Sequence, residues 1–80
     1  MPNIQIYSTQ QCPYCVRAKA LLQTKGLGYE EIDVSNDISM MQEMITRSGN
    51  RSVPQVFIDG DSVGGYLELT QWNAAGKLES

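Results

Sequence analysis

Apolar and polar residues alternate along residues 3–8, with Ile4 and Ile6 on one side, and this pattern predicts a β-strand. Over residues 13–25 the apolar positions recur every three or four residues instead, which predicts a helix that ends at Gly26. Along the rest of the chain these periods, a short apolar run at 54–58 and a hairpin signal at Asp59-Gly60 predict the order β-α-β-α-β-β-α. The expected elements are strand 3–8, helix 13–25, strand 29–34, helix 37–48, strand 54–58, strand 62–63 and helix 66–75.

The connections between these elements predict how the strands pair. A strand–helix–strand unit places its two strands parallel, so the first two strands should be parallel. Asp59-Gly60 is a strong signal for a tight hairpin, so the last two strands should be antiparallel. The sequence therefore predicts an α/β fold with a mixed four-stranded sheet flanked by three helices. The second helix should face the sheet with an apolar stripe of Ile38, Met41, Met44 and Ile45.

Length and charge narrow the class of protein. The chain has 80 residues, of which 41% are hydrophobic and 19% are charged, as in an ordinary globular protein. Typical domains have roughly 100–150 residues, so we expect a single domain over residues 1–80. Six basic against nine acidic residues give a net charge of −3. Nucleic-acid affinity depends on clustered Lys and Arg, so we expect no nucleic-acid partner.

The location and the available chemistry are also limited by composition. Apolar runs are far shorter than the roughly 20 residues that cross a bilayer, and the start of the chain lacks the segments of a signal peptide. We therefore expect a cytoplasmic protein without membrane association. Histidine is absent, which excludes Ser–His–Asp triads, Cys–His pairs and His-ligated metals. The chemistry must then depend on thiols, carboxylates or backbone dipoles.

The two cysteines form a Cys12-Pro13-Tyr14-Cys15 motif where the first strand leads into the first helix. In that context the C-x-x-C spacing favours a redox pair. Cys12 falls at the start of the helix, where free N–H groups and the helix dipole favour a thiolate. Cys15, one turn further on, should be the more buried, resolving thiol. Two alternatives stay open at this point: small core residues, or two ligands of a shared metal ion.

Three motifs together resemble those of a glutaredoxin: Cys12 to Cys15, the segment Ser52 to Ile58, and Gly64-Gly65-Tyr66. The bacterial dithiol type with a CPYC motif is the most similar, and the resemblance covers essentially the whole chain. It implies a thioredoxin-like fold, a cis Val53–Pro54 peptide bond and a monomeric enzyme. It also implies that no cofactor or metal is bound permanently and that glutathione is the reducing co-substrate.

The resemblance further implies a role for individual residues. Cys12 would be the nucleophile and Cys15 the resolving thiol, in the reduction of glutathione mixed disulfides and protein disulfides. The partners would be glutathione and disulfide-bearing or glutathionylated proteins, with ribonucleotide reductase as a candidate. The glutathione groove would be lined by Tyr14, Ser52, Val53, Pro54, Gly65, Tyr66 and Leu67.

Three positions depart from the family's pattern by losing a polar group. Thr9 stands where a basic residue is common, Met41 where Gln or Arg is frequent, and Leu67 where a polar or acidic residue is frequent. This loss favours an alternative, a redoxin that donates electrons to a partner such as ribonucleotide reductase and is recharged by thioredoxin reductase. A third hypothesis is a metal-binding CxxC protein. Its iron–sulfur form, a dimer bridged by Cys12 and glutathione, is disfavoured by Pro13.

Overall fold

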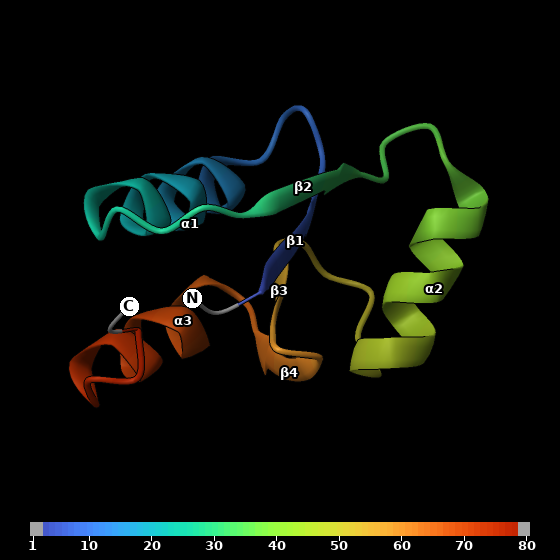
Figure 1. Ribbon diagram of the computed structural model, residues 1–80. Coiled ribbons are helices and arrows are strands. Elements are labelled where there is room, and N and C mark those ends of the chain that lie inside the picture. Colours follow the sequence, from blue (N-terminus) through green and yellow to red (C-terminus); the bar gives the residue numbers. More distant parts are fainter. Residues whose placement is uncertain (1–2, 79–80) are drawn as a thin grey trace.

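The computed structural model describes residues 3–78 and has the predicted order of elements (Figure 1). No boundary differs from the predicted one by more than one residue. The elements are β1 (Ile4–Ser8), α1 (Pro13–Thr24), β2 (Glu30–Asp33), α2 (Ile38–Ser48), β3 (Gln55–Ile58), β4 (Asp61–Gly64) and α3 (Tyr66–Ala74).

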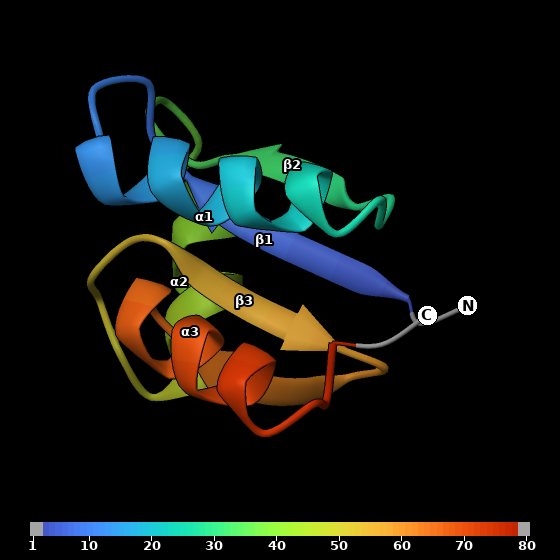
Figure 2. The ribbon, with the colours of Figure 1, turned by 90° about the vertical axis from the view of Figure 1, so that its left-hand side faces the viewer.

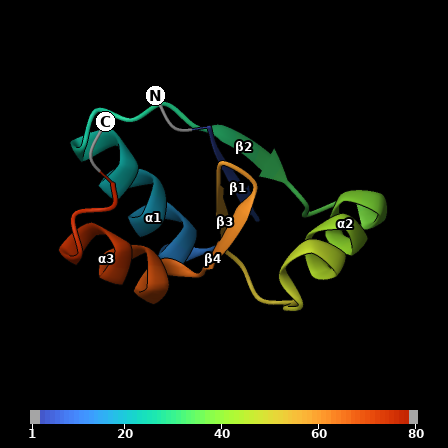
Figure 3. The same cartoon turned by 60° about the horizontal axis from the view of Figure 1, so that its bottom comes forward.

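The strands form one mixed sheet in the order β2-β1-β3-β4. β1 is parallel to β2 and antiparallel to β3, and β3 is antiparallel to β4, so both predicted pairings are confirmed. Figure 3 shows α1 and α3 together on one face of the sheet and α2 alone on the other. The result is three layers with the sheet in the middle.

Local chemistry explains where several elements begin and turn. Pro13 occupies the first turn of α1, where its missing N–H costs no hydrogen bond. Asp37 caps α2, because its carboxylate accepts a hydrogen bond from the Met40 N–H at 3.0 Å. The hairpin between β3 and β4 has positive φ at both Asp59 (53°) and Gly60 (86°), as a two-residue turn of this kind requires.

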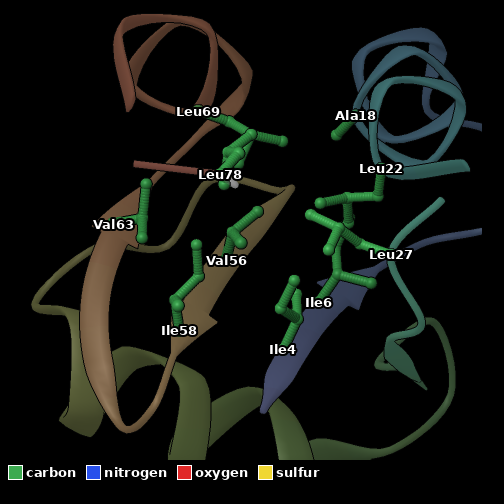
Figure 4. Packing of buried hydrophobic residues seen from close by; sticks show 10 residues of the cluster. All are labelled: Ile4, Ile6, Ala18, Leu22, Leu27, Val56, Ile58, Val63, Leu69 and Leu78. Carbon is green, nitrogen blue, oxygen red and sulfur yellow. The ribbon is translucent and has the colours of Figure 1, made fainter. Parts of the chain in front are cut away.

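The larger part of the core lies between the sheet and the pair α1 and α3. Figure 4 shows these apolar side chains projecting into the space between the strands and the two helices. Strand alternation sends Ile4 and Ile6 to this face, while Tyr7 points to the other one. The buried members are Ile4, Ile6, Ala18, Leu22, Leu27, Val56, Ile58, Val63, Leu69 and Leu78.

A smaller core lies between the sheet and α2. Tyr7, Val34, Met44 and Phe57 are its buried members, and Met41 and Ile45 pack against them. The prediction that Ile38 belongs to the same stripe is wrong, since its side chain is 78% exposed. Ile38 is the first residue of α2 and borders an open hollow of about 600 Å³ instead of the sheet.

A polar link ties α1 to the edge of the sheet. The Glu31 carboxylate accepts hydrogen bonds from Lys19 Nζ at 2.8 Å and from Ser8 Oγ at 2.9 Å. These two bonds, the one from Lys19 first, hold the pKa of Glu31 below its ordinary value of 4.5. Because Lys19 belongs to α1, Glu31 to β2 and Ser8 to β1, the link holds the helix against these two strands.

Substitutions in α2 should separate its buried and exposed apolar residues. Met44→Ala removes a fully buried side chain and should lower the free energy of unfolding by about 2–5 kcal/mol. Ile38→Ala, at an exposed position, should change it by at most about 0.5 kcal/mol. Urea unfolding of both variants measures the difference, and equal losses would contradict the placement of Ile38.

The Glu31 link should make stability depend on pH. Because the folded-state pKa is lowered, the link stabilises the fold above the unfolded-state pKa, and this contribution is lost as pH falls through the folded-state value. Glu31→Gln should therefore cost stability at about pH 6 and less at about pH 3. The side chain is 41% exposed, so we expect a difference of at most about 1 kcal/mol.

Urea unfolding at the two pH values measures this difference. Glu30→Gln is the matched control, because the neighbouring Glu30 carboxylate accepts its hydrogen bond from an amide, Gln5. An equal pH dependence of the two variants would contradict the role of Lys19.

Candidate active site

The two cysteines lie where β1 leads into α1. Cys12 is the N-cap residue of α1 and is half-buried, whereas Cys15 lies in the first turn and is only 1% exposed. The prediction that Cys15 is the more buried of the two is therefore confirmed. The pair forms a disulfide, with the Cα atoms 5.1 Å apart. The sulfur of Cys12 is thus the one that a second molecule can approach.

The surroundings of the Cys12 sulfur favour a negative charge. The backbone N–H of Cys15 donates a hydrogen bond to Cys12 Sγ at 3.1 Å. The first turn of α1 contains no acidic residue of its own that would oppose the positive end of the helix dipole. After reduction the same N–H and the same dipole would stabilise a thiolate.

The Cys12 sulfur also lies beside the loop that precedes β3. Its Sγ is 3.8 Å from the carbonyl oxygen of Val53. The Val53–Pro54 peptide bond is cis, as the resemblance implies. Pro54 is buried and Val53 is half-buried, and the backbone of these two residues forms a wall next to the disulfide.

A groove of about 280 Å³ opens next to this wall. It is formed by the start of α1, the loop before β3 and the start of α3, which lie at one end of the molecule (Figure 2). The structure brings together all seven residues that the resemblance placed in a glutathione groove, and it adds Glu68. The lining residues are Tyr14, Ser52, Val53, Pro54, Gly65, Tyr66, Leu67 and Glu68.

Glu68 lies against the glycine pair. Its Oε1 accepts a hydrogen bond from the Gly65 N–H at 2.7 Å. Gly64 has φ +115°, and a Cβ atom there would lie 2.9 Å from Glu68 Cγ, so a larger residue would collide. Sequence reasoning missed this contact, although an acidic residue three positions after a helix cap is a known signal for it.

The rim of the groove is aromatic and apolar. Tyr14 is 53% exposed, and its ring centre lies 6.1 Å from that of Tyr66. The Arg17 guanidinium lies 5.3 Å from the Tyr14 ring centre, on the side of α1. Leu67 is 66% exposed. The rim thus presents apolar surface to a ligand that approaches Cys12.

Two positions at which the family often has polar groups lie outside the groove. Thr9 borders a separate hollow with Gln10, Gln11 and Ser35. Met41 lines the hollow at the start of α2. Neither residue is among those that line the groove beside Cys12.

Within residues 3–78, no helix is both long and apolar enough to cross a membrane. The same part of the chain contains no group of three or more His, Cys, Asp or Glu residues placed to hold a metal ion.

This arrangement is that of a thiol–disulfide oxidoreductase. The Cys12 sulfur is accessible at a helix start, the Cys15 sulfur is buried one turn away, and the cis Val53–Pro54 bond lies beside them. The sequence model of the Glutaredoxin family matches residues 4–63. Glutaredoxin 3 of Escherichia coli K12 is 44% identical over 79 residues, which cover 99% of this chain and 95% of that protein. A Pseudomonas aeruginosa glutaredoxin is 41% identical over 80 residues, covering 100% of this chain and 95% of that protein. The chain therefore belongs to the glutaredoxin family.

Solved structures agree with this assignment. The chain resembles a Brucella melitensis glutaredoxin with a TM-score of 0.82 and 45% identity, covering 95% of this chain and 83% of that one. It resembles the buckwheat protein of a glutaredoxin–glutathione complex with a TM-score of 0.86 and 29% identity, covering 96% and 73% of the two chains. The fold is thioredoxin-like, and the protein is a glutathione-dependent thiol–disulfide oxidoreductase.

The position of Cys12 at the start of α1 should make its reduced form reactive at neutral pH. In the Cys15→Ser variant, where only Cys12 can titrate, half of the thiol should be ionised well below pH ~8.5, the value for a free cysteine. The ultraviolet absorbance of the thiolate measures this midpoint. The same variant unfolded in urea is the control and should show the ordinary value. A folded midpoint as high as the unfolded one would contradict the effect of the helix start.

Proposed function

We propose that this protein reduces glutathione mixed disulfides and protein disulfides through a Cys12–Cys15 dithiol. The observation that supports the proposal most directly is the half-buried Cys12 sulfur, which lies at the start of α1 beside a groove that a small peptide could fill. Cys15 is shielded from solvent, so it would react with Cys12 and not directly with a second molecule.

With a glutathione mixed disulfide, the Cys12 thiolate would attack the glutathione sulfur. A bond forms between Cys12 and glutathione, and the substrate's sulfur leaves as a thiolate that takes a proton from solvent. A second glutathione thiolate then attacks the glutathione sulfur on Cys12. Glutathione disulfide is released and the Cys12 thiolate is restored. One half of this disulfide comes from the substrate, so each turnover consumes one free glutathione.

With a protein disulfide, the Cys12 thiolate would attack one of its two sulfurs and form a mixed disulfide with the protein. The S–S bond of the protein breaks, and its other sulfur leaves as a thiolate that takes a proton from solvent. Cys15 would then attack the Cys12 sulfur, which releases the reduced protein and closes the Cys12–Cys15 disulfide. Two glutathione molecules would reopen it. The S–S bond between Cys12 and Cys15 is therefore the oxidised state of this second route.

Glutathione would bind as an extended peptide along the groove. We infer that its cysteinyl segment pairs with the backbone of Val53, because the Val53 carbonyl lies beside the Cys12 sulfur. Tyr14 and Tyr66 would flank the ligand, with Ser52 and Pro54 along one wall and Gly65 and Leu67 at the start of α3. We place this activity in the cytoplasm, in a monomer formed by residues 1–80, with ribonucleotide reductase among the candidate protein substrates.

One observation favours a second candidate, a redoxin recharged by thioredoxin reductase. Among the described residues that line the groove, none is Lys or Arg, whereas glutathione has two carboxylates. Coupled turnover of a small mixed disulfide, with either glutathione plus its reductase or thioredoxin reductase, distinguishes the two. The proposal requires faster turnover with glutathione.

Serine substitutions should separate the roles of the two cysteines. Cys12→Ser should abolish all turnover, because no attacking thiolate remains. Cys15→Ser should keep activity on glutathione mixed disulfides, where free glutathione can resolve the intermediate, and lose most activity on protein disulfides. Initial rates on both substrates measure this difference. Equal loss of both activities in Cys15→Ser would show that the roles are assigned wrongly.

A further inference from the structure

Gln55 is a buried polar residue that lies just behind the groove. It is the first residue of β3, is 2% exposed and does not line the groove itself. It belongs to a central strand of the sheet, and its backbone pairs with that of Tyr7 in β1. A buried amide needs hydrogen-bond partners, and those of Gln55 show what it holds in place.

The Gln55 side chain is bonded to the loop that forms one wall of the groove. Its Nε2 donates hydrogen bonds to the carbonyl oxygen of Ser52 at 2.8 Å and to Ser52 Oγ at 3.3 Å. Ser52 is exposed, as are Asn50 and Arg51 before it. The amide of Gln55 thus anchors an exposed loop to the rigid sheet.

The outer part of the loop is joined to the same anchor. Both the N–H and the Oγ of Ser52 donate to Asn50 Oδ1, at 3.0 and 2.9 Å. The Asn50 N–H donates in turn to Ser48 Oγ at 3.1 Å, at the end of α2. A chain of hydrogen bonds therefore runs from α2 through Asn50 and Ser52 to Gln55.

This chain of bonds determines where the groove wall lies relative to the reactive sulfur. Ser52 and Val53 are consecutive wall residues, and the Val53 carbonyl oxygen lies 3.8 Å from Cys12 Sγ. A shift of Ser52 would move the Val53 backbone with it, since the two share a peptide bond. The Cys15 N–H that faces the Cys12 sulfur belongs to α1 and would not move.

We propose that Gln55 is a positioning residue for substrate binding. It holds the Ser52–Val53 wall at the separation from Cys12 that an extended glutathione moiety requires, without touching that moiety. The inference rests on the proposed binding of glutathione in the groove. It assigns to Gln55 an effect on substrate affinity and none on the reactivity of the thiol.

The test is Gln55→Met, which keeps the length of the side chain and removes both donors. With the mixed disulfide of glutathione and cysteine as substrate, KM should rise about three- to tenfold, as for the loss of one or two hydrogen bonds. The value of kcat should stay within about twofold, and the ionisation midpoint of Cys12 should be unchanged. A purely structural role would alter stability without this division between KM and kcat.

Ser8→Ala is the matched control, because Ser8 is also a buried polar residue of the sheet, but its hydroxyl donates to Glu31, away from the groove. Asn50→Ala removes the outer bonds from an exposed position, where folding is not at risk, and should raise KM about twofold. If Gln55→Met does not fold, Asn50→Ala decides the question.

The proposal is overturned if KM is unchanged in the folded variants or rises equally in Ser8→Ala. If the unmodified protein does not turn over this substrate at all, the proposed function fails, and the inference fails with it. Normal turnover by the unmodified protein, together with an unchanged KM in the variants, overturns the inference alone.

Discussion

The antiparallel pairing of β1 with β3 is the constraint on which the active site depends. In this register Tyr7, near the end of β1, lies opposite Gln55 at the start of β3. The segment that leaves β1 toward Cys12 and the segment that enters β3 through Val53 therefore meet at the same end of these two strands. Because β4 is antiparallel to β3, β4 finishes at this same end of the sheet, where α3 begins. One pattern of backbone hydrogen bonds thus brings three distant segments of the chain together.

Most of the fold could be predicted from the sequence, because the spacing of apolar residues distinguishes its helices from its strands, and Pro, Gly and Asp-Gly mark where they begin and end. Ile38 is the exception, and the reason is physical. Helical spacing shows which residues share a face of α2, but not whether a strand lies beneath the first turn. The cysteine pair could be located for the opposite reason, since its geometry is local. Its spacing of three residues within one turn of helix suffices to bring the sulfurs together.

The groove could not be predicted from local patterns, because the residues that form its walls are far apart in the sequence. Its composition followed from the resemblance to a family and not from any periodicity. The roles of two side chains, Glu68 and Gln55, were not predicted, although each forms a hydrogen bond with the residue three positions before it. Glu68 accepts a hydrogen bond from the N–H of Gly65, the N-cap residue of α3, and an acidic residue three positions after a helix cap can be seen in the sequence. Gln55 lies in a short apolar strand, where nothing in the sequence indicates that an amide is buried and bonded to the preceding loop.

The close spacing of the disulfide has a consequence for the folding equilibrium. A crosslink stabilises a protein mainly by reducing the conformational freedom of its unfolded chain, and it does so least when it closes a short loop. Cys12 and Cys15 are only three residues apart, so opening their bond restores little freedom to the unfolded chain. Loss of conformational freedom in the unfolded chain should accordingly favour the oxidised form by only about 2 kcal/mol, less than a crosslink over a longer loop would give. The free energy of thiol–disulfide exchange is then available for the reaction with a partner and is not consumed in refolding the protein at each cycle.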